Sequence, residues 1–549
     1  MRWSNRSTER VLFSLRLPGN LPAHSLRMIV MSRKNITIVA CGLLVCMGSS
    51  VAAQSRVNGL VSPVEARRYG LEPSWFTRVE LDQARGRINN LRYYVSATNG
   101  RTLFEVSYGD SRRMFSERDL DRFGEPLGPD GAKRAAEEFA AQLRRLEIES
   151  EIKSHEVPEI TLYVTTDRSL VQAIDAETGR TLWATTVGRR DFPMDGPGVN
   201  EKYVAVINGT SLYLLTRDTG QIVWVRTTRG VPAAGPAVSD RFVVVPTWTG
   251  DVELYELEEP RKLPNMFKSN GRSMLRPTVT PNSIIWPTDR GMLYVASSQR
   301  HTIRFRLEAK DTIAAPASVF SPNQVFVASV DGYVYALQEN VHSERWRFST
   351  GLSITTTPIP TGESLYVVTD NMNLYCLDQE TGALKWVAPS FRQFIAASPD
   401  RVYGIGVTER LEILDANTGG RIASMNLGNL DVFYQNDQSD RIIVGTRTGI
   451  LQSLHEIGRE IPALHVDLAE RRPEVERPEV PEVDDSETPT KPSPKPRVDD
   501  RDPFDDATDP FGGDTDPFGG GADPFGGGQD QPEDPFGGGA DPFGGDDPF

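Results

Sequence analysis

The stretch SLYVVTDNMNLYCLDQETGALKW, residues 364–386, contains two strand-turn-strand units in succession. Residues 364–369 alternate in the manner of a half-buried strand, Asp370–Asn371 makes a polar turn, and residues 373–377 form a second strand. Residues 378–382 then turn the chain into a third strand. Because these gaps are too short for the crossovers that parallel strands need, the stretch predicts an antiparallel meander.

An apolar doublet marks the first of these strands, and it recurs along the chain at steps of 37 to 42 residues. The doublets begin at Leu162, Tyr203, Phe242, Ile284, Val325, Leu365, Val402 and Ile442. A period of about 40 residues is the length of one four-stranded blade. The sequence therefore predicts an all-β fold, a β-propeller of eight blades, over residues 159–468.

The turn before the last strand of each period repeats a second pattern. It reads AIDAETGRTLW at 173–183, LLTRDTGQIVW at 214–224, CLDQETGALKW at 376–386 and ILDANTGGRIA at 413–423, and ALQENVHSERW at 336–346 keeps the spacing. Glycine supplies the positive φ of the turn, Asp or Thr can hydrogen-bond its backbone, and Trp offers a large surface to the neighbouring blade. The residues assigned to this docking motif are Asp175, Gly179, Trp183, Gly220, Trp224, Trp346, Asp378, Gly382, Trp386, Asp415 and Gly419.

The docking motif resembles that of the pyrroloquinoline-quinone-like propeller repeats, whose form is A-x-D-x-x-T-G-x-x-x-W. A WD40 propeller is the alternative, but its repeats end in a Trp-Asp pair, and the chain contains no such pair. The resemblance implies eight blades locked together by tryptophans, and it covers about residues 160–468.

Two families share this repeat, and each implies a different function. Quinoprotein alcohol dehydrogenases hold their quinone and a calcium ion over the central channel and carry a disulfide between adjacent cysteines, whereas this chain has no adjacent cysteines and no motif onto which their cofactor residues transfer. BamB-like proteins are non-catalytic scaffolds of the outer-membrane β-barrel assembly machinery that bind partners through interblade loops. We therefore expect a scaffold without cofactor, with a quinoprotein dehydrogenase or a small-molecule- or glycan-binding propeller as alternatives.

The N-terminal segment, residues 1–53, predicts export. Ser32-Arg33-Lys34 is a basic stretch, an apolar run follows at 36–47, and Val51-Ala52-Ala53 offers small residues for cleavage near Ala53. The run is too short to span a membrane, so the mature chain is expected in the periplasm or outside the cell, with outer-membrane association as an option. A lipobox ending at Cys41 is the alternative, although the apolar stretch before it is short.

Only one cysteine, Cys376, remains after removal of this segment, so no intramolecular disulfide can form. Cys376 occupies a strand position that other repeats fill with small or apolar residues, which predicts a buried small hydrophobe and no nucleophile. The chain has no nucleophile elbow, phosphate-binding glycine loop or zinc motif, and its six histidines show no metal-ligand spacing. The sequence predicts neither a catalytic site nor a metal.

Residues 54–158 do not follow the period. Trp75–Leu81 reads as a strand that closes the ring, and Leu91–Ala97 with Arg101–Tyr108 reads as a hairpin through Thr98-Asn99-Gly100. A helix is predicted from about Pro129 to Ile148 with one apolar face. This hairpin-helix element either decorates the first blade or forms a small domain of its own.

Residues 469–549 change composition to a Pro- and Glu-rich linker followed by seven Asp-Pro-Phe units. From Asp499 onward 15 acidic residues face only Arg501, so nearly all of the net charge of −15 belongs to this tail. The composition predicts disorder, and the alternative is a multivalent ligand that resembles the Asp-Pro-Phe ligands of endocytic adaptors. No nucleic-acid partner is expected, because the rest of the chain is nearly neutral.

The partner surface is therefore expected on the propeller, with envelope proteins, barrel-assembly components among them, as partners. Trp248 and Arg392 lie outside the repeat pattern and are candidate contact residues on its loops.

Overall fold

The computed structural model describes residues 60–81, 86–109, 111–320, 323–339, 341 and 343–468. The predicted export signal and the Asp-Pro-Phe tail lie outside these residues. The chain divides into two units, 1–475 and 476–549, and every described residue belongs to the first. Neither of the helices in this part of the chain has the length and apolarity that a membrane crossing requires.

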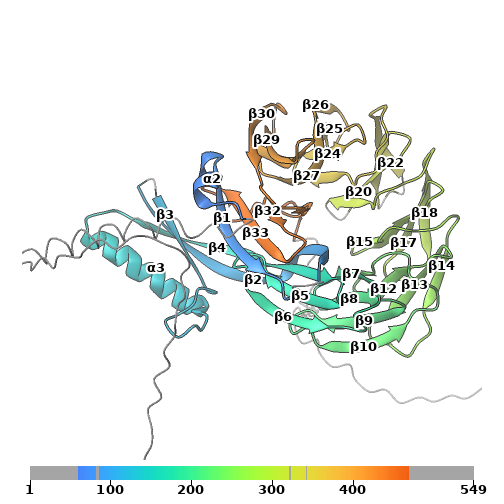
Figure 1. Cartoon of the computed structure of the whole chain (residues 1–549), viewed down its shortest axis with the longest axis horizontal. Helices are drawn as coiled ribbons and strands as arrows, with labels where there is room; N and C mark the ends of the chain where they lie inside the picture. The colour runs from blue at the N-terminus through green and yellow to red at the C-terminus, as the bar shows by residue number, and fades with distance from the viewer. Residues whose placement is uncertain are drawn as a thin grey trace, which may run out of the picture. The chain divides into compact units, whose positions relative to one another are not determined.

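The described residues form an all-β fold of antiparallel sheets, seven with four strands and one with five, which follow one another around a common axis (Figure 1). The first sheet has the order β3-β2-β4-β5-β6, with β2 at Ile88–Tyr108, β3 at Ser111–Ser116, β4 at Glu151–Thr166, β5 at Leu170–Asp175 and β6 at Thr181–Thr186. The two helices are α2 at Pro63–Arg68 and α3 at Gly128–Arg145. The predicted all-β class and antiparallel meander are confirmed.

The next three sheets run in chain order from the axis outward. The second holds β7 (Met194–Val199), β8 (Tyr203–Asn208), β9 (Ser211–Thr216) and β10 (Ile222–Thr227). The third holds β11 (Ala237–Val238), β12 (Phe242–Pro246), β13 (Asp251–Glu256) and β14 (Asn265–Lys268). The fourth holds β15 (Thr278–Val279), β16 (Ser283–Pro287), β17 (Met292–Ser297) and β18 (Ile303–Glu308).

The remaining sheets repeat this plan. The fifth holds β19 (Ser318–Phe320), β20 (Gln324–Ala328), β21 (Tyr333–Gln338) and β22 (Ser343–Ser349). The sixth holds β23 (Ile359–Thr361), β24 (Ser364–Val368), β25 (Asn373–Asp378) and β26 (Leu384–Pro389). The seventh holds β27 (Phe391–Ala397), β28 (Arg401–Gly406), β29 (Arg410–Asp415) and β30 (Arg421–Asn426). The last has the order β1-β33-β32-β31, with β1 at Leu71–Arg78, β31 at Val432–Phe433, β32 at Ile442–Gly445 and β33 at Ile450–Glu456.

Apolar cores lie between neighbouring sheets. Tyr163 of the first sheet shares a core with Val204 of the second, and each later pair of neighbours is joined in the same way. Ile443 of the last sheet shares a core with Leu162 of the first. The packing therefore runs from the last sheet back to the first, which is the arrangement of a β-propeller.

The last sheet combines the two ends of the described chain. β1 pairs antiparallel with β33, with Leu71 opposite Glu456 and Arg78 opposite Ile450. The strand that the sequence placed at Trp75–Leu81 thus begins earlier, at Leu71. This pairing covers the outer edge of β33, which would otherwise expose unpaired backbone groups.

The hairpin predicted between Leu91–Ala97 and Arg101–Tyr108 is wrong. Both segments belong to β2, which pairs with β4 along its length and carries a bulge between Val95 and Gly100. The observed hairpin joins β2 to β3 further on, next to Gly109, whose φ is +54°.

A partly buried carboxylate of the second sheet, that of Glu201, explains why Thr98-Asn99-Gly100 does not turn the chain. The Glu201 carboxylate accepts hydrogen bonds from the Ala97 N–H at 2.6 Å and from the Ser96 and Thr98 hydroxyls at 2.7 and 3.0 Å. Burial alone would raise the pKa of Glu201, but these hydrogen bonds lower it on balance. The bulge is therefore held as part of the strand by a residue about a hundred positions away.

Beyond the bulge, β2 and β4 continue out of the first sheet and are joined there by β3 and α3 (Figure 1). α3 covers one face of this extension, with Ala136, Ala140 and Leu143 packed on Val106 and Phe115. The helix ends at Arg145, before the predicted Ile148, and Leu146, which follows it, is 69% exposed. The position between residues 158 and 159, where the sequence suggested a boundary, falls within β4.

Candidate functional site

The docking turns have the same geometry in several sheets. In the first, Asp175 accepts hydrogen bonds from the backbone N–H groups of Glu177 and Thr178 at 2.9 and 3.4 Å, and Gly179 has a φ of +71°. Asp378 and Asp415 each accept from the N–H and hydroxyl of the Thr three residues later, and these hydrogen bonds lower the pKa of both carboxyl groups. These carboxylates are thus engaged within their own turns.

The docking tryptophans bind the next sheet. The indole N–H of Trp183 donates to the Arg217 carbonyl at 2.7 Å. The same bond runs from Trp224 to Leu257 at 3.2 Å, from Trp346 to Gln379 at 3.1 Å and from Trp386 to Ala416 at 2.9 Å. Each bond satisfies a buried donor and fixes one sheet against its neighbour.

The turn glycines have a second role, because the tryptophan of the preceding sheet lies against them. A Cβ atom on Gly220 would lie 2.3 Å from the Trp183 ring, and one on Gly382 or Gly419 would lie 2.5 Å from Trp346 or Trp386. Distances below 3.0 Å leave no room for a side chain. Glycine is therefore required by the neighbouring ring as well as by the turn.

A further docking tryptophan lies outside the repeat pattern. Trp75 of β1 donates its indole N–H to the Ala176 carbonyl at 2.7 Å and lies against Gly179, so it joins the last sheet to the first. No A-x-D-x-x-T-G pattern precedes Trp75, so only its partner turn could have indicated the contact.

Cys376 lies in the core between the sixth and seventh sheets and is fully buried. Burial raises the pKa of its thiol, which keeps it protonated and unreactive.

The loops at one end of the sheets carry an exposed apolar pair, Trp248 and Val231. Trp248 lies in the turn between β12 and β13, and its backbone N–H donates to the Val231 carbonyl at 2.9 Å. Their side chains are 48% and 58% exposed. Arg392, the other contact candidate, is exposed and lies 3.4 Å from the exposed Glu409 carboxylate, so its charge already has a partner.

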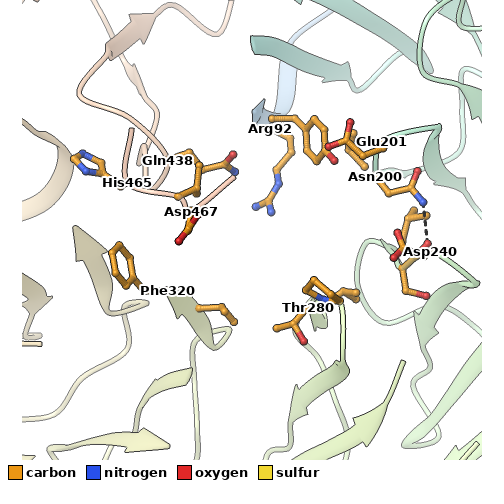
Figure 2. A pocket seen from close by; sticks show the side chains of 17 residues that line it. Arg92, Asn200, Glu201, Asp240, Thr280, Phe320, Gln438, His465 and Asp467 are labelled. Atoms are coloured by element: carbon orange, nitrogen blue, oxygen red, sulfur yellow. Dashed lines mark hydrogen bonds between the residues drawn. The ribbon is translucent and has the colours of Figure 1, made fainter. Parts of the chain in front are cut away.

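The innermost strands surround a central channel with two adjoining cavities of about 170 and 340 Å³. Figure 2 shows the smaller one, where Arg92, Glu201 and Asp240 lie opposite Gln438 and Asp467. Burial, with the nearby Glu201 carboxylate, raises the pKa of Asp240. In the described part of the chain, no group of three or more His, Cys, Asp or Glu residues is arranged to hold a metal ion.

The docking turns and the ring of sheets define the class of protein, a β-propeller with tryptophan-docking repeats. A family model described as outer membrane protein assembly factor BamB matches residues 141–263 and 296–429. A relative from Shewanella oneidensis, called outer membrane protein assembly factor BamB, is 20% identical over 278 residues. That match covers 47% of this chain and 59% of the relative.

Solved structures with a similar fold were also found. BamB from Moraxella catarrhalis has a TM-score of 0.45 at 13% identity, with 54% of this chain and 91% of that chain covered. The computationally designed protein Ika8 has a TM-score of 0.44 at 13% identity, with 54% and 93% covered. By its docking motif and by these matches, the chain is similar to the pyrroloquinoline-quinone-like β-propellers and, among them, to BamB.

Proposed function

We propose that the chain is a non-catalytic scaffold of the cell envelope, a propeller of eight blades that binds partner proteins through the loops of one face. The family match supports this role, because the matched relative is by name an outer membrane protein assembly factor. Components of outer-membrane barrel assembly are therefore the proposed partners. The docking-motif residues hold the blades together in this proposal, and no cofactor takes part.

The observation that carries the proposal is the exposed pair Trp248 and Val231. Exposed aromatic side chains on a rigid frame are typical anchors of protein interfaces, because they bury a large area at a small cost in conformational entropy. The pair stands on the third sheet, whose strands β12 and β13 hold its turn in place.

The proposal includes the division of the chain. Residues 1–53 act as an export signal cleaved near Ala53, residues 54–158 supply the ring-closing strand and the hairpin-helix extension, and residues 159–468 form the propeller. Residues 469–549 form a linker and an acidic tail that binds no dedicated partner. The protein acts in the periplasm, in association with the outer membrane.

The test is an affinity pull-down from the envelope fraction with full-length protein and a Trp248→Ala variant. We expect barrel-assembly components to be recovered with the wild type and lost with the variant, while the two have the same melting temperature. Equal recovery with both would refute the loop surface, and the absence of assembly components from the wild-type sample would refute the partner class.

Leu263→Ala is the matched control. Leu263 is 74% exposed and lies in the connection between β13 and β14, at the opposite end of β13 from Trp248. This substitution also removes an exposed apolar side chain from the third sheet, so it should leave recovery unchanged.

A further inference from the structure

The larger cavity of the central channel brings together hydrogen-bond donors that have no acceptor in the described part of the chain. Arg92 comes from β2 of the first sheet, and Arg276 lies two residues before β15 of the fourth. Both arginines are partly buried, and neither guanidinium has a hydrogen bond or ion pair with a described residue. Figure 2 shows the Arg92 side chain extending into the channel.

Two of the hydroxyl groups that line the same cavity, those of Tyr434 and Ser318, can donate to a ligand. The Tyr434 hydroxyl accepts a hydrogen bond from the Tyr93 N–H at 3.0 Å, which leaves its own proton available to a ligand. The Ser318 side chain is 6% exposed, and its Oγ has no hydrogen-bond partner among the described residues. Buried donors are almost always satisfied in folded proteins, so the unpartnered Ser318 hydroxyl, beside two arginines that face the same cavity, points to a ligand.

Two arginines and one carboxylate line the larger cavity, whereas Glu201, Asp240 and Asp467 line the adjoining smaller one. Asp437 is the acidic residue that lines the larger cavity, and Asp437 makes no ion pair within 4.0 Å with either arginine. Burial, followed by repulsion from Arg92, lowers the pKa of Arg276 to about 9. Attraction to Asp437 offsets this only in part, and an anion between the two arginines would relieve the remaining cost of burying the Arg276 guanidinium.

We propose that the channel binds a small organic acid whose carboxylate lies between Arg92 and Arg276. A carboxylate accepts two parallel hydrogen bonds from a guanidinium, which suits a pair of arginines. The Tyr434 and Ser318 hydroxyls supply the remaining donors. A cavity of about 340 Å³ is within the range of small-molecule sites and excludes large ligands. This site is independent of the loop surface around Trp248.

The experiment is isothermal titration calorimetry of the full-length protein with succinate, with neutral succinamide and with inorganic phosphate. We expect succinate to bind and succinamide not to bind. Arg92→Met and Arg276→Met should each weaken succinate binding at least tenfold, while Arg392→Met, which removes an exposed arginine, should not change it. No succinate binding by the wild type, equal binding by Arg276→Met, or binding of phosphate alone would overturn the proposal.

Thermal unfolding separates a binding role from a structural one. If Arg276 serves a ligand, Arg276→Met should melt at the same temperature as the wild type or higher, because an unpaired guanidinium is removed. A lower melting temperature without ligand would assign Arg276 a structural role and contradict the proposal. Ser318→Ala, which removes one hydroxyl oxygen, should weaken succinate binding a few-fold at unchanged stability.

Discussion

Polar groups are hydrogen-bonded to protein partners at the outer rim of the ring of sheets, but several have no such partner at the wall of the central channel. At the rim, the indole N–H of Trp183 and the carboxylate of Asp175 are each paired within or across the turns. In the channel, the guanidinium groups of Arg92 and Arg276 have no such partners among the described residues. The paired polar groups of the rim therefore stabilise the fold. The unpaired donors of the channel lower its stability but remain available to a ligand.

The comparison predicts the largest effect for a rim tryptophan. Trp183→Ala should lower the free energy of unfolding by about 3–5 kcal/mol, because it removes a buried aromatic side chain and its hydrogen bond. Trp183 is 8% exposed. Chemical denaturation of both proteins measures the difference, and Trp248→Ala, at an exposed position, should change it by only about 0.5 kcal/mol or less. Similar losses in the two variants would show that the rim contact contributes little.

His455 tests the closure between β33 and β1. Its Nδ1 lies 2.7 Å from the Ser74 hydroxyl, and burial, with repulsion from Arg441, lowers its pKa to about 4. Because an unfolded histidine titrates near 6.5, the stability from the neutral ring is complete above that pH and is lost as pH falls toward 4. The loss amounts to about 3 kcal/mol.

The measurement is the free energy of unfolding of wild type and His455→Gln between pH 7.5 and 4. The difference in free energy of unfolding between the two proteins should become smaller as the pH falls from 7.5 to 4. Burial raises the pKa of the neighbouring Asp440 to about 6, which adds stability as pH falls, but this contribution is common to both proteins and cancels in the difference. A gap that is independent of pH would contradict the buried neutral histidine.

Substitutions at two glycines distinguish the requirement for a positive φ in the docking turn from the requirement for space beside the tryptophan ring. Gly220→Ala combines an unfavourable positive φ with a clash against Trp183, and it should cost about 3 kcal/mol. Gly351→Ala has nearly the same φ, +68°, but no atom within 4 Å of the new Cβ, so it should cost only about 1 kcal/mol. Urea denaturation measures the free energy of unfolding of both variants. Equal losses would mean that the contact with the Trp183 indole does not require glycine at position 220.

The smallest effect is expected at Arg392, which the sequence placed on a loop and which lies exposed in strand β27. Arg392→Ala breaks an ion pair with Glu409 whose partners are 56% and 76% exposed, so it should change stability by about 0.5 kcal/mol or less. Differential scanning calorimetry at low and high salt would detect anything larger.

How far the sequence could predict the structure depended on how local each signal is. A docking turn such as Asp378 to Trp386 lies within a single stretch, so its spacing was visible. The bulge at Thr98 was read as a turn, because the carboxylate that holds it belongs to Glu201. Arg92 and Arg276 lie far apart in the chain and meet only because the sheets surround an axis, so no spacing could have paired them.

The pairing of β1 with β33 also sets an order of events in the life of the chain. Residues 71–78 emerge early from the ribosome, but their partner at 450–456 is made almost last. At ordinary rates of synthesis the first strand waits on the order of tens of seconds for its partner. A chain released after Asn426 and before Ile450 would retain the seven other sheets and leave β1 without its partner β33. The final pairing therefore distinguishes finished molecules from interrupted ones, and protease resistance of residues 71–78 would report when synthesis is complete.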